Sequence, residues 1–320
     1  MKQKRNVTSL LTLAELDPNT MDLMLTFSLK LKASRGNSKR LPLQGKTVAL
    51  LFEKPSTRTR VSFQVATSEL GGSSISLGSS EIQLGRGETI EDTARVLSRY
   101  VHAIMARVNE HREVERLASC SSVPVINGLS DLYHPVQILA DLLTLRERKG
   151  TLKGLKVAWV GDGNNVCNSW LIGAATTGIH FTTATPPDYA PDSEAVKTAS
   201  LIAKGTGASL VLLEDPKEAV AGADCVITDT FVSMGFDKER EERVRVFLPR
   251  YKIDQRMMAL AKRDAIFEHC LPAHRGEEVT DEVIDGPNSA VWDEAENRLH
   301  TTKALLCYFM LGQGALLKPP

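Results

Sequence analysis

The densest group of residues able to do chemistry follows an apolar run, residues 47–52. Residues 56–60 (STRTR) place three hydroxyls and two guanidinium groups at the start of a predicted helix. Backbone N–H groups without helical partners and the positive end of the helix dipole favour an anion at such a position. The glycines and lysine of a Walker A loop are missing. A Ser56 helix cap with solvated arginines is the ordinary interpretation, but Pro55 and the density of the string favour a phosphate-binding turn.

Two later segments could contribute to the same site. Arg107 lies near the end of a predicted strand, 103–108, and His134 and Gln137 lie one turn apart at the start of a predicted helix, 134–148. The dipole at a helix start favours the neutral form of a histidine, whose N–H can polarise a carbonyl oxygen. Taken alone, a helix-capping histidine and a surface ion pair of Arg107 are the more ordinary explanations.

A glycine-rich turn follows the first apolar run of the second half of the chain. Gly161-x-Gly163 is similar to the start of a dinucleotide-binding fingerprint, but Val166 replaces the third glycine and no acidic residue ends the following strand. Both differences weaken the prediction of a nicotinamide cofactor. Asn164 and Asn165 offer amides suited to a small polar ligand, although an ordinary Asx turn explains them equally well.

Two further strand ends carry polar groups. Asp229 ends a predicted strand, and a carboxylate in that position can bind an ammonium group flanked by Ser233 and Met234. Cys270 follows another predicted strand and precedes Pro272, which favours contact with a ligand. The ordinary interpretations are that the methionine fills the core and that the cysteine is buried and inert.

The predicted strands and helices that must position these residues form two successive β–α series along the chain. A break at Lys149-Gly150 separates the two series. Apolar runs alternate with amphipathic stretches in both series, a pattern typical of parallel sheets with crossover helices. We predict an α/β protein with two doubly wound domains, residues 1–148 and 149–293, and a C-terminal helix within 294–320 that packs back on the first domain. The predicted strands are 47–52, 74–77, 103–108, 124–127, 156–160, 180–185, 209–213, 225–229, 265–269 and 290–292.

Every candidate residue falls at a helix start or near the carboxyl end of a predicted strand, which is where open parallel sheets bind their ligands. We therefore expect the two domains to face one cleft. The first domain would supply an anion-binding half and the second an amine-binding half.

The composition excludes other classes of protein. A chain of 320 residues with 42% hydrophobic residues can form sizeable cores and is not disordered. Lys and Arg total 39, as do Asp and Glu, so the basic excess of nucleic-acid-binding proteins is missing. No apolar run is long enough to span a membrane. The five cysteines never form a C-x-x-C pair, which suits free thiols in the cytoplasm or in a mature organellar protein.

Together, these residues resemble the carbamoyltransferases in order and spacing. The segments that carry the resemblance are 56–60 (STRTR), 134–137 (HPVQ), Asp229 with 233–235 (SMG), and 269–272 (HCLP). The last two look like those of the ornithine-using branch of the family rather than the aspartate-using branch. The resemblance covers nearly the whole chain. It implies that the δ-amine of ornithine attacks the carbamoyl carbon of carbamoyl phosphate, giving citrulline and phosphate.

The resemblance also implies a role for each matching residue. The implied contacts to carbamoyl phosphate come from Ser56, Thr57, Arg58, Thr59, Gln83, Arg107, His134, Gln137, Cys270, Leu271 and Arg298. The implied contacts to ornithine come from Asn165, Asp229, Ser233 and Met234. The implied catalytic residues are Cys270, Arg107 and His134, with the thiol binding or orienting the amine and carrying the family's label of proton acceptor. Phe231 stands where relatives often have tryptophan.

The resemblance further implies a homotrimer, or a multiple of one, in which Gln83 reaches a neighbouring subunit's site. No cofactor is expected, and no metal, because His269, Cys270 and His274 lack a convincing zinc spacing. The nearest alternative is a carbamoyltransferase for another amine, such as putrescine. A nicotinamide-dependent dehydrogenase and a non-catalytic sensor of phosphate ligands also stay open. The sequence does not distinguish arginine biosynthesis from the reverse, catabolic direction.

Overall fold

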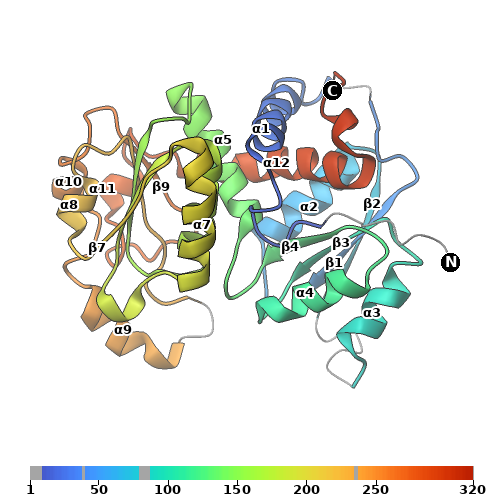
Figure 1. Ribbon diagram of the computed structural model, residues 1–320, viewed down its shortest axis with the longest axis horizontal. Coiled ribbons are helices and arrows are strands. Elements are labelled where there is room, and N and C mark those ends of the chain that lie inside the picture. Colours follow the sequence, from blue (N-terminus) through green and yellow to red (C-terminus); the bar gives the residue numbers. More distant parts are fainter. Residues whose placement is uncertain (1–8, 38–39, 79–86, 234–236, 320) are drawn as a thin grey trace. The chain divides into compact units, whose positions relative to one another are not determined.

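The computed structural model describes residues 9–37, 40–78, 87–233 and 237–319 (Figure 1). The chain forms two compact units, one made of Met1–Ala140 and Arg298–Pro320 and the other of Asp141–Asn297. It passes from the first unit to the second within one long helix and returns within another. In the part of the chain that is described, no helix combines the length and the apolar character needed to cross a membrane.

Among the described residues, the first unit has a sheet of four parallel strands in the order β2-β1-β3-β4. Figure 1 shows α3 and α4 on one face of this sheet and α1, α2 and α12 on the other. The bounds of these elements are α1 (Pro18–Ala33), β1 (Thr47–Phe52), α2 (Arg58–Glu69), β2 (Ser73–Gly78), α3 (Ile90–Leu97), β3 (Ala103–Arg107), α4 (His111–Cys120), β4 (Val125–Leu129), α5 (Pro135–Lys149), which continues into the second unit, α12 (Val291–Leu311) and η4 (Gln313–Ala315).

The described part of the second unit has five parallel strands in the order β7-β6-β5-β8-β9. Its elements are β5 (Lys156–Val160), α6 (Asn165–Thr177), β6 (His180–Ala184), η2 (Pro187–Tyr189), α7 (Ser193–Thr206), β7 (Leu210–Leu213), α8 (Pro216–Val220), β8 (Cys225–Ile227), η3 (Asp237–Glu239), α9 (Arg240–Phe247), α10 (Gln255–Met258), β9 (Ile266–Glu268) and α11 (Asp281–Ile284).

The order of strands reverses once in each sheet. In the first unit the chain runs outward from β1 to β2 and then returns to β3 on the other side of β1. In the second unit it runs from β5 through β6 to β7 and then returns to β8 beside β5. Ligands bind outside the carboxyl ends of the strands at such a reversal. The residues that follow β1, β3, β5 and β8 are therefore well placed for function.

The prediction of two parallel-sheet α/β domains with a C-terminal helix is confirmed. The predicted strand at 290–292 is wrong, because α12 begins at Val291. Ser289 forms one isolated bridge to Phe267, and the N–H of Ala290 donates to the Phe267 carbonyl at 2.8 Å. The N–H of Glu294 then donates to the Ala290 carbonyl at 2.9 Å, so the backbone turns into the helix after a single residue of pairing.

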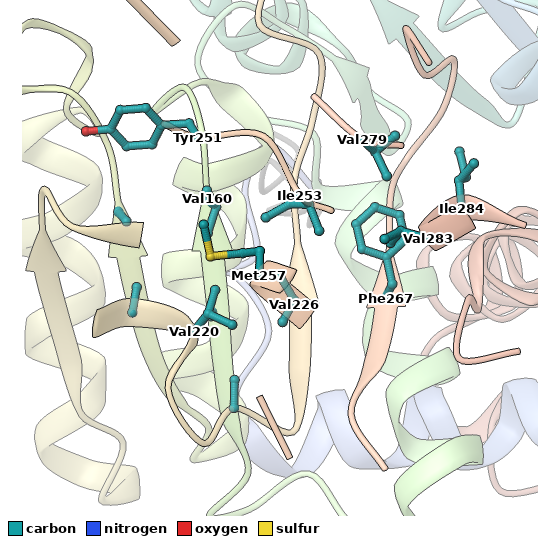
Figure 2. Packing of buried hydrophobic residues seen from close by; sticks show 14 of the residues in the cluster. Val160, Val220, Val226, Tyr251, Ile253, Met257, Phe267, Val279, Val283 and Ile284 are labelled. Atoms are coloured by element: carbon teal, nitrogen blue, oxygen red, sulfur yellow. The ribbon is translucent and has the colours of Figure 1, made fainter. Parts of the chain in front are cut away.

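An apolar cluster forms the core of the second unit around β5, β8 and β9 (Figure 2). Ile253 lies in it, fully buried, with Val160, Val226 and Phe267 among the members. Replacing Ile253 by alanine should lower the free energy of unfolding by about 2–5 kcal/mol, because apolar contacts are lost and a cavity remains. Replacing it by valine should cost only about 0.5–1.5 kcal/mol.

Urea unfolding followed by tryptophan fluorescence measures this difference. All three tryptophans, at positions 159, 170 and 292, belong to the second unit and report on it. Equal losses in the two variants would mean that Ile253 does not pack as the structure shows.

Candidate active site

The STRTR segment forms the turn between β1 and the start of α2. The cap position of α2 falls on Thr57 rather than Ser56, and the Thr57 side chain makes no capping hydrogen bond. The Thr57 hydroxyl is exposed, while Ser56 and Arg58 are half-buried. Because the helix start does not use this hydroxyl, it can bind an anion together with the backbone N–H groups.

Arg107 lies beside this turn because of the strand register. β1 and β3 pair in parallel with Phe52 opposite Arg107, and the N–H of Glu53 donates to the Arg107 carbonyl at 2.9 Å. Arg107 is buried, with 5% of its surface exposed. The guanidinium group therefore belongs to the same strand-end site as the turn.

Arg298 connects three helices of the first unit. It lies in α12 with 2% exposure, and its Nη1 donates to Oε1 of Gln137 in α5. Its Nη2 donates to the Thr59 hydroxyl in α2 at 3.0 Å. Three of the residues predicted for one ligand, from distant parts of the sequence, are thereby in direct contact.

His134 is buried at the start of α5, among three arginines. Burial lowers its pKa well below the usual value, and the positive charges of Arg298, Arg107 and Arg58 lower it further, in that order. The imidazole is therefore neutral at neutral pH and can donate an N–H to a carbonyl oxygen. The sequence argument ascribed the neutral form to the helix dipole, whereas burial and the three guanidinium groups are the causes here.

The charge around these residues of the first unit is strongly positive. A group of buried or half-buried cations is costly unless anionic charge accompanies it. Guanidinium groups match phosphate oxygens in geometry, and the start of α2 adds backbone donors. This group of residues is suited to a phosphate dianion that carries a carbonyl group.

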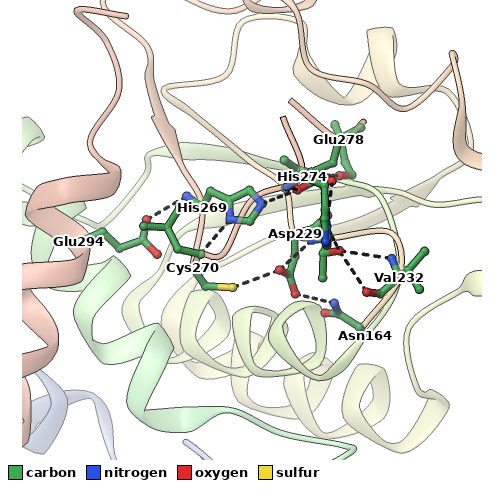
Figure 3. Close-up of polar contacts among 12 residues, drawn as sticks. Asn164, Asp229, Val232, His269, Cys270, His274, Glu278 and Glu294 are labelled. Carbon is green, nitrogen blue, oxygen red and sulfur yellow. Dashed lines mark hydrogen bonds and ion pairs between the residues drawn. The ribbon is translucent and has the colours of Figure 1, made fainter. Parts of the chain in front are cut away.

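In the second unit, Asp229 is the centre of a small polar network (Figure 3). It follows β8 and is buried, with 7% exposure. Its Oδ1 accepts from the Cys270 thiol at 3.1 Å and from the Thr230 N–H at 2.8 Å, and its Oδ2 accepts from Asn164 Nδ2 at 2.8 Å. The residues after β5, β8 and β9 thus meet at one carboxylate.

The chemistry of Cys270 follows from this contact. Burial raises the pKa of the thiol well above its usual value, and the negative charge of Asp229 raises it further. The thiol group is enclosed, whereas other atoms of Cys270 keep some exposure, because the residue as a whole is only half-buried. At neutral pH the group is a thiol and a hydrogen-bond donor, which argues against a role as covalent nucleophile.

The segment that carries Cys270 is held by the residue before it. His269 is fully buried, and its Nδ1 accepts from the Leu271 N–H at 2.9 Å, so the ring proton lies on Nε2 and faces Glu278 Oε1 at 3.3 Å. Leu271 has φ of 56°, a left-handed conformation that non-glycine residues adopt only at a cost. The N–H of His269 donates to Glu294 Oε2 at 2.9 Å. This backbone is therefore fixed from both ends.

Two of the remaining predicted residues lie near Asp229 in the sequence or at the start of α6, and two lie outside the described residues. Asn165 is the first residue of α6, while its neighbour Asn164 caps that helix by accepting from two backbone N–H groups. Ser233 is half-buried, four residues after Asp229. Gln83 and Met234 lie outside the described residues.

One network that the sequence reasoning missed supports the Asp229 loop. Arg243 of α9 is buried and donates to Asp162 Oδ2 at 2.8 Å and to the Phe231 carbonyl at 3.2 Å. Burial raises the pKa of Asp162 to about 6, against the lowering effect of Arg243. Arg243 and Asp162 are 81 positions apart in the sequence, so no local pattern indicates that they pair.

Three carboxyl groups are buried near one another in the second unit. Glu268, the last residue of β9, is fully buried, and neither of its carboxylate oxygens has a hydrogen-bond partner among the described residues. Burial raises its pKa well above the usual value, and the charges of Glu294 and Asp141 raise it further. Asp141 accepts from Trp170 Nε1 at 3.0 Å. Burial and these two neighbouring carboxyl groups therefore favour the protonated form of Glu268.

Replacing Glu268 by glutamine should stabilise the protein above about pH 5, because glutamine has nearly the same shape and cannot ionise. A raised folded-state pKa means that this carboxyl stabilises the fold fully below its unfolded value of 4.5. The stabilisation is lost as the pH rises toward the folded-state pKa, by about 1.4 kcal/mol per pH unit. The advantage of the variant should grow as the pH rises above about 5. Urea unfolding at several pH values measures it, and a difference independent of pH would refute the assignment.

Comparison with known proteins finds family models for both parts of the chain. Residues 8–147 match the family model described as "Aspartate/ornithine carbamoyltransferase, carbamoyl-P binding domain", and residues 153–309 match "Aspartate/ornithine carbamoyltransferase, Asp/Orn binding domain". The chain is 57% identical over 270 residues to the ornithine carbamoyltransferase of Pyrococcus horikoshii, covering 84% of this chain and 85% of that protein. It is 51% identical over 305 residues to that of Halalkalibacterium halodurans, covering 95% of each.

The structure is also similar to solved ones. That of ornithine carbamoyltransferase from Pyrococcus furiosus superposes with a TM-score of 0.91 at 51% identity, covering 94% of this chain and 96% of that one. That of anabolic ornithine carbamoyltransferase from Campylobacter jejuni gives a TM-score of 0.90 at 42% identity, covering 94% and 98%. The chain belongs to the aspartate/ornithine carbamoyltransferase family.

Proposed function

We propose that this protein transfers the carbamoyl group of carbamoyl phosphate to the δ-amine of L-ornithine, releasing L-citrulline and phosphate. The observation that carries the proposal is the buried Asp229 carboxylate, bonded to Cys270 and Asn164, in a chain 51–57% identical to proteins named ornithine carbamoyltransferase. An ammonium-bearing acceptor matches this carboxylate, whereas the second carboxylate of aspartate would be repelled by it.

Carbamoyl phosphate is assigned to the first unit. Its phosphate would lie at the start of α2 with Ser56, Thr57, Arg58 and Thr59, and Arg298 would support it through Thr59. Its carbamoyl end would contact Arg107, His134 and Gln137, the last of which is bonded to Arg298. The positive charge described above matches the dianion. The assigned domain is 1–148 with 294–320.

Ornithine is assigned to the second unit, residues 149–293. Asp229 would bind its side-chain amine, and Cys270 would orient that amine through the thiol. Asn165, Ser233 and Met234 complete the assigned contacts. Leu271, held in its left-handed conformation by His269, is assigned to the contact between the two substrates.

The reaction would use these groups in one displacement. The side-chain ammonium of ornithine first gives one proton to solvent water. The neutral amine then forms a bond to the carbamoyl carbon, the bond from that carbon to the phosphate oxygen breaks, and the departing phosphate takes up the second amine proton. The N–H groups of Arg107 and neutral His134 stabilise the negative charge that develops on the carbonyl oxygen. Arg58 and the helix start stabilise the departing phosphate. Holding both substrates in place supplies much of the remaining acceleration.

We also propose the assembly and setting that the family suggests. The protein would form a homotrimer or a multiple of one, with Gln83 completing a neighbouring subunit's site. It would act in the cytoplasm, in arginine metabolism. Size-exclusion chromatography with light scattering measures the assembly, and a monomer that turns over at full rate would contradict it.

A citrulline-forming assay tests the function. Purified protein receives carbamoyl phosphate with ornithine, putrescine or aspartate as acceptor, and each carbamoylated product is measured. Ornithine should be preferred by orders of magnitude. A preference for putrescine would indicate a different acceptor on the same site, and phosphate-ligand binding without product would indicate a sensor.

A further inference from the structure

A second group of charged side chains lies in the second unit, outside the residues assigned to the substrates. His274, Glu277 and Glu278 follow the Cys270 segment, and each offers one ligand atom within 4.8 Å of the others. Figure 3 draws His274 and Glu278 beside the Cys270 segment, and Nδ1 of His274 lies 3.9 Å from Oε2 of Glu278. The reaction proposed above gives none of the three a role.

Glu278 is the member of the group whose burial most strongly favours a bound cation. The residue is fully buried, and its Oε1 accepts from the His274 backbone N–H and faces His269 Nε2 at 3.3 Å. Its Oε2 lies 3.9 Å from His274 Nδ1 and accepts no hydrogen bond from the described residues. Leaving a buried carboxylate oxygen without a donor is costly. A cation at that oxygen would remove the cost.

Glu277 repeats the same arrangement. Its Oε1 accepts from the Arg240 guanidinium, whereas its Oε2 is buried and has no hydrogen-bond partner in the described part of the chain. In both glutamates, one oxygen is held by a donor and the other is left for a ligand. Outer contacts of this kind orient the carboxylates that bind metal ions in proteins.

His274 completes the group with a ring nitrogen. Its Nδ1 lies 2.8 Å from the Thr230 hydroxyl, which fixes the ring. Arg275, the neighbouring cation, points elsewhere, because its guanidinium is bonded to Asp281 and Asp285. One imidazole and two carboxylates suit divalent transition metals, whereas Ca²⁺ and Mg²⁺ prefer oxygen ligands alone.

We propose that His274, Glu277 and Glu278 form a binding site for a divalent transition metal ion of the Zn²⁺ or Mn²⁺ class. The two carboxylates balance the charge of the ion, and water completes its coordination. Bonds of about 2.0–2.2 Å require the donors to draw together. Rotations of the half-buried His274 and Glu277 side chains would achieve this, with His274 Nδ1 exchanging its contact with the Thr230 hydroxyl for the ion.

The experiment must separate this site from a second group of donors. Asp229, His269 and Cys270 also offer ligand atoms within 4.8 Å of one another, and a thiol has high affinity for zinc. The parent protein for the test is therefore Cys270→Ser. Removing the thiol disables that group and leaves His274, Glu277 and Glu278 in place.

ZnCl₂ is titrated calorimetrically into full-length Cys270→Ser protein. One equivalent should bind, and adding His274→Ala should abolish that binding. Adding Glu277→Gln should weaken it by more than about tenfold. Glu282→Gln, which alters an exposed acid of α11, is the matched control and should change nothing. Circular dichroism verifies that each variant is folded.

A crystal of the Cys270→Ser protein soaked in ZnCl₂ gives an independent readout. The anomalous signal of zinc should lie between His274 and the two glutamates. The proposal is overturned if Cys270→Ser binds no zinc, or if the equivalent persists unchanged after His274→Ala. Neither result would affect the assignment of the carbamoyl transfer, because the titration contains no substrate.

Discussion

Replacing Arg58 by alanine should lower kcat/KM for carbamoyl phosphate by at least about 100-fold. The guanidinium group is assigned to the phosphate, and removing one charged donor from a developing or bound anion typically costs that much. Initial rates of citrulline formation, with each substrate varied in turn, measure the effect. The loss should fall mainly on carbamoyl phosphate.

Arg60→Ala is the matched control for this variant. Arg60 lies two residues further along the same turn, but its guanidinium sits over the Phe52 ring at 4.8 Å and has no assigned substrate contact. The Arg60→Ala substitution removes one positive charge from the same helix turn, as Arg58→Ala does. Equal losses in the two variants would show that overall charge, not an Arg58 contact, holds the phosphate.

Replacing Asp229 by asparagine should lower kcat/KM for ornithine by at least about 100-fold, while binding of carbamoyl phosphate persists. The substitution keeps the shape of the side chain and an oxygen for Asn164 Nδ2 or the Cys270 thiol, but removes the charge that is assigned to the amine. Losing a buried ion-pair partner costs several kcal/mol, which supports a loss of this size.

Steady-state kinetics with ornithine varied, and calorimetry with carbamoyl phosphate alone, measure the two effects of Asp229→Asn. Asp188→Asn, at an exposed acid of η2, is the control. A variant that loses carbamoyl phosphate binding and ornithine use equally would contradict the assignment of separate substrates to the two units.

The sequence predicts the bounds of a strand best where a single short apolar run forms the whole strand. Residues 47–52 and 156–160 are short runs that are buried except at their first residues, and both strands have the predicted bounds. β8 ends at Ile227 rather than at Asp229. The Thr228 hydroxyl there donates to the Val160 carbonyl at 2.6 Å, a contact with another strand that no local pattern reveals.

The site residues likewise separate into those that a local pattern predicts and those that depend on contacts between distant residues. Arg107 and the STRTR turn are neighbours because β1 and β3 pair, whereas the alternating pattern indicates only that both lie at carboxyl ends of parallel strands. The contacts of Arg298 with Gln137 and Thr59 span 161 and 239 positions, so the sequence placed Arg298 only through family resemblance. Glu278 gives no sequence signal, because its role depends on complete burial beside His269.

The return of the chain to the first unit has a consequence for synthesis on the ribosome. Domains tend to fold as units while the chain emerges. Residues 141–297 form one continuous segment, so the second unit can fold before the first has all its parts. Arg298 emerges after all of residues 141–297, and its contacts with α2 and α5 form only then. A nascent chain should therefore lack the Arg298 contacts of the site until this part of α12 has left the ribosome.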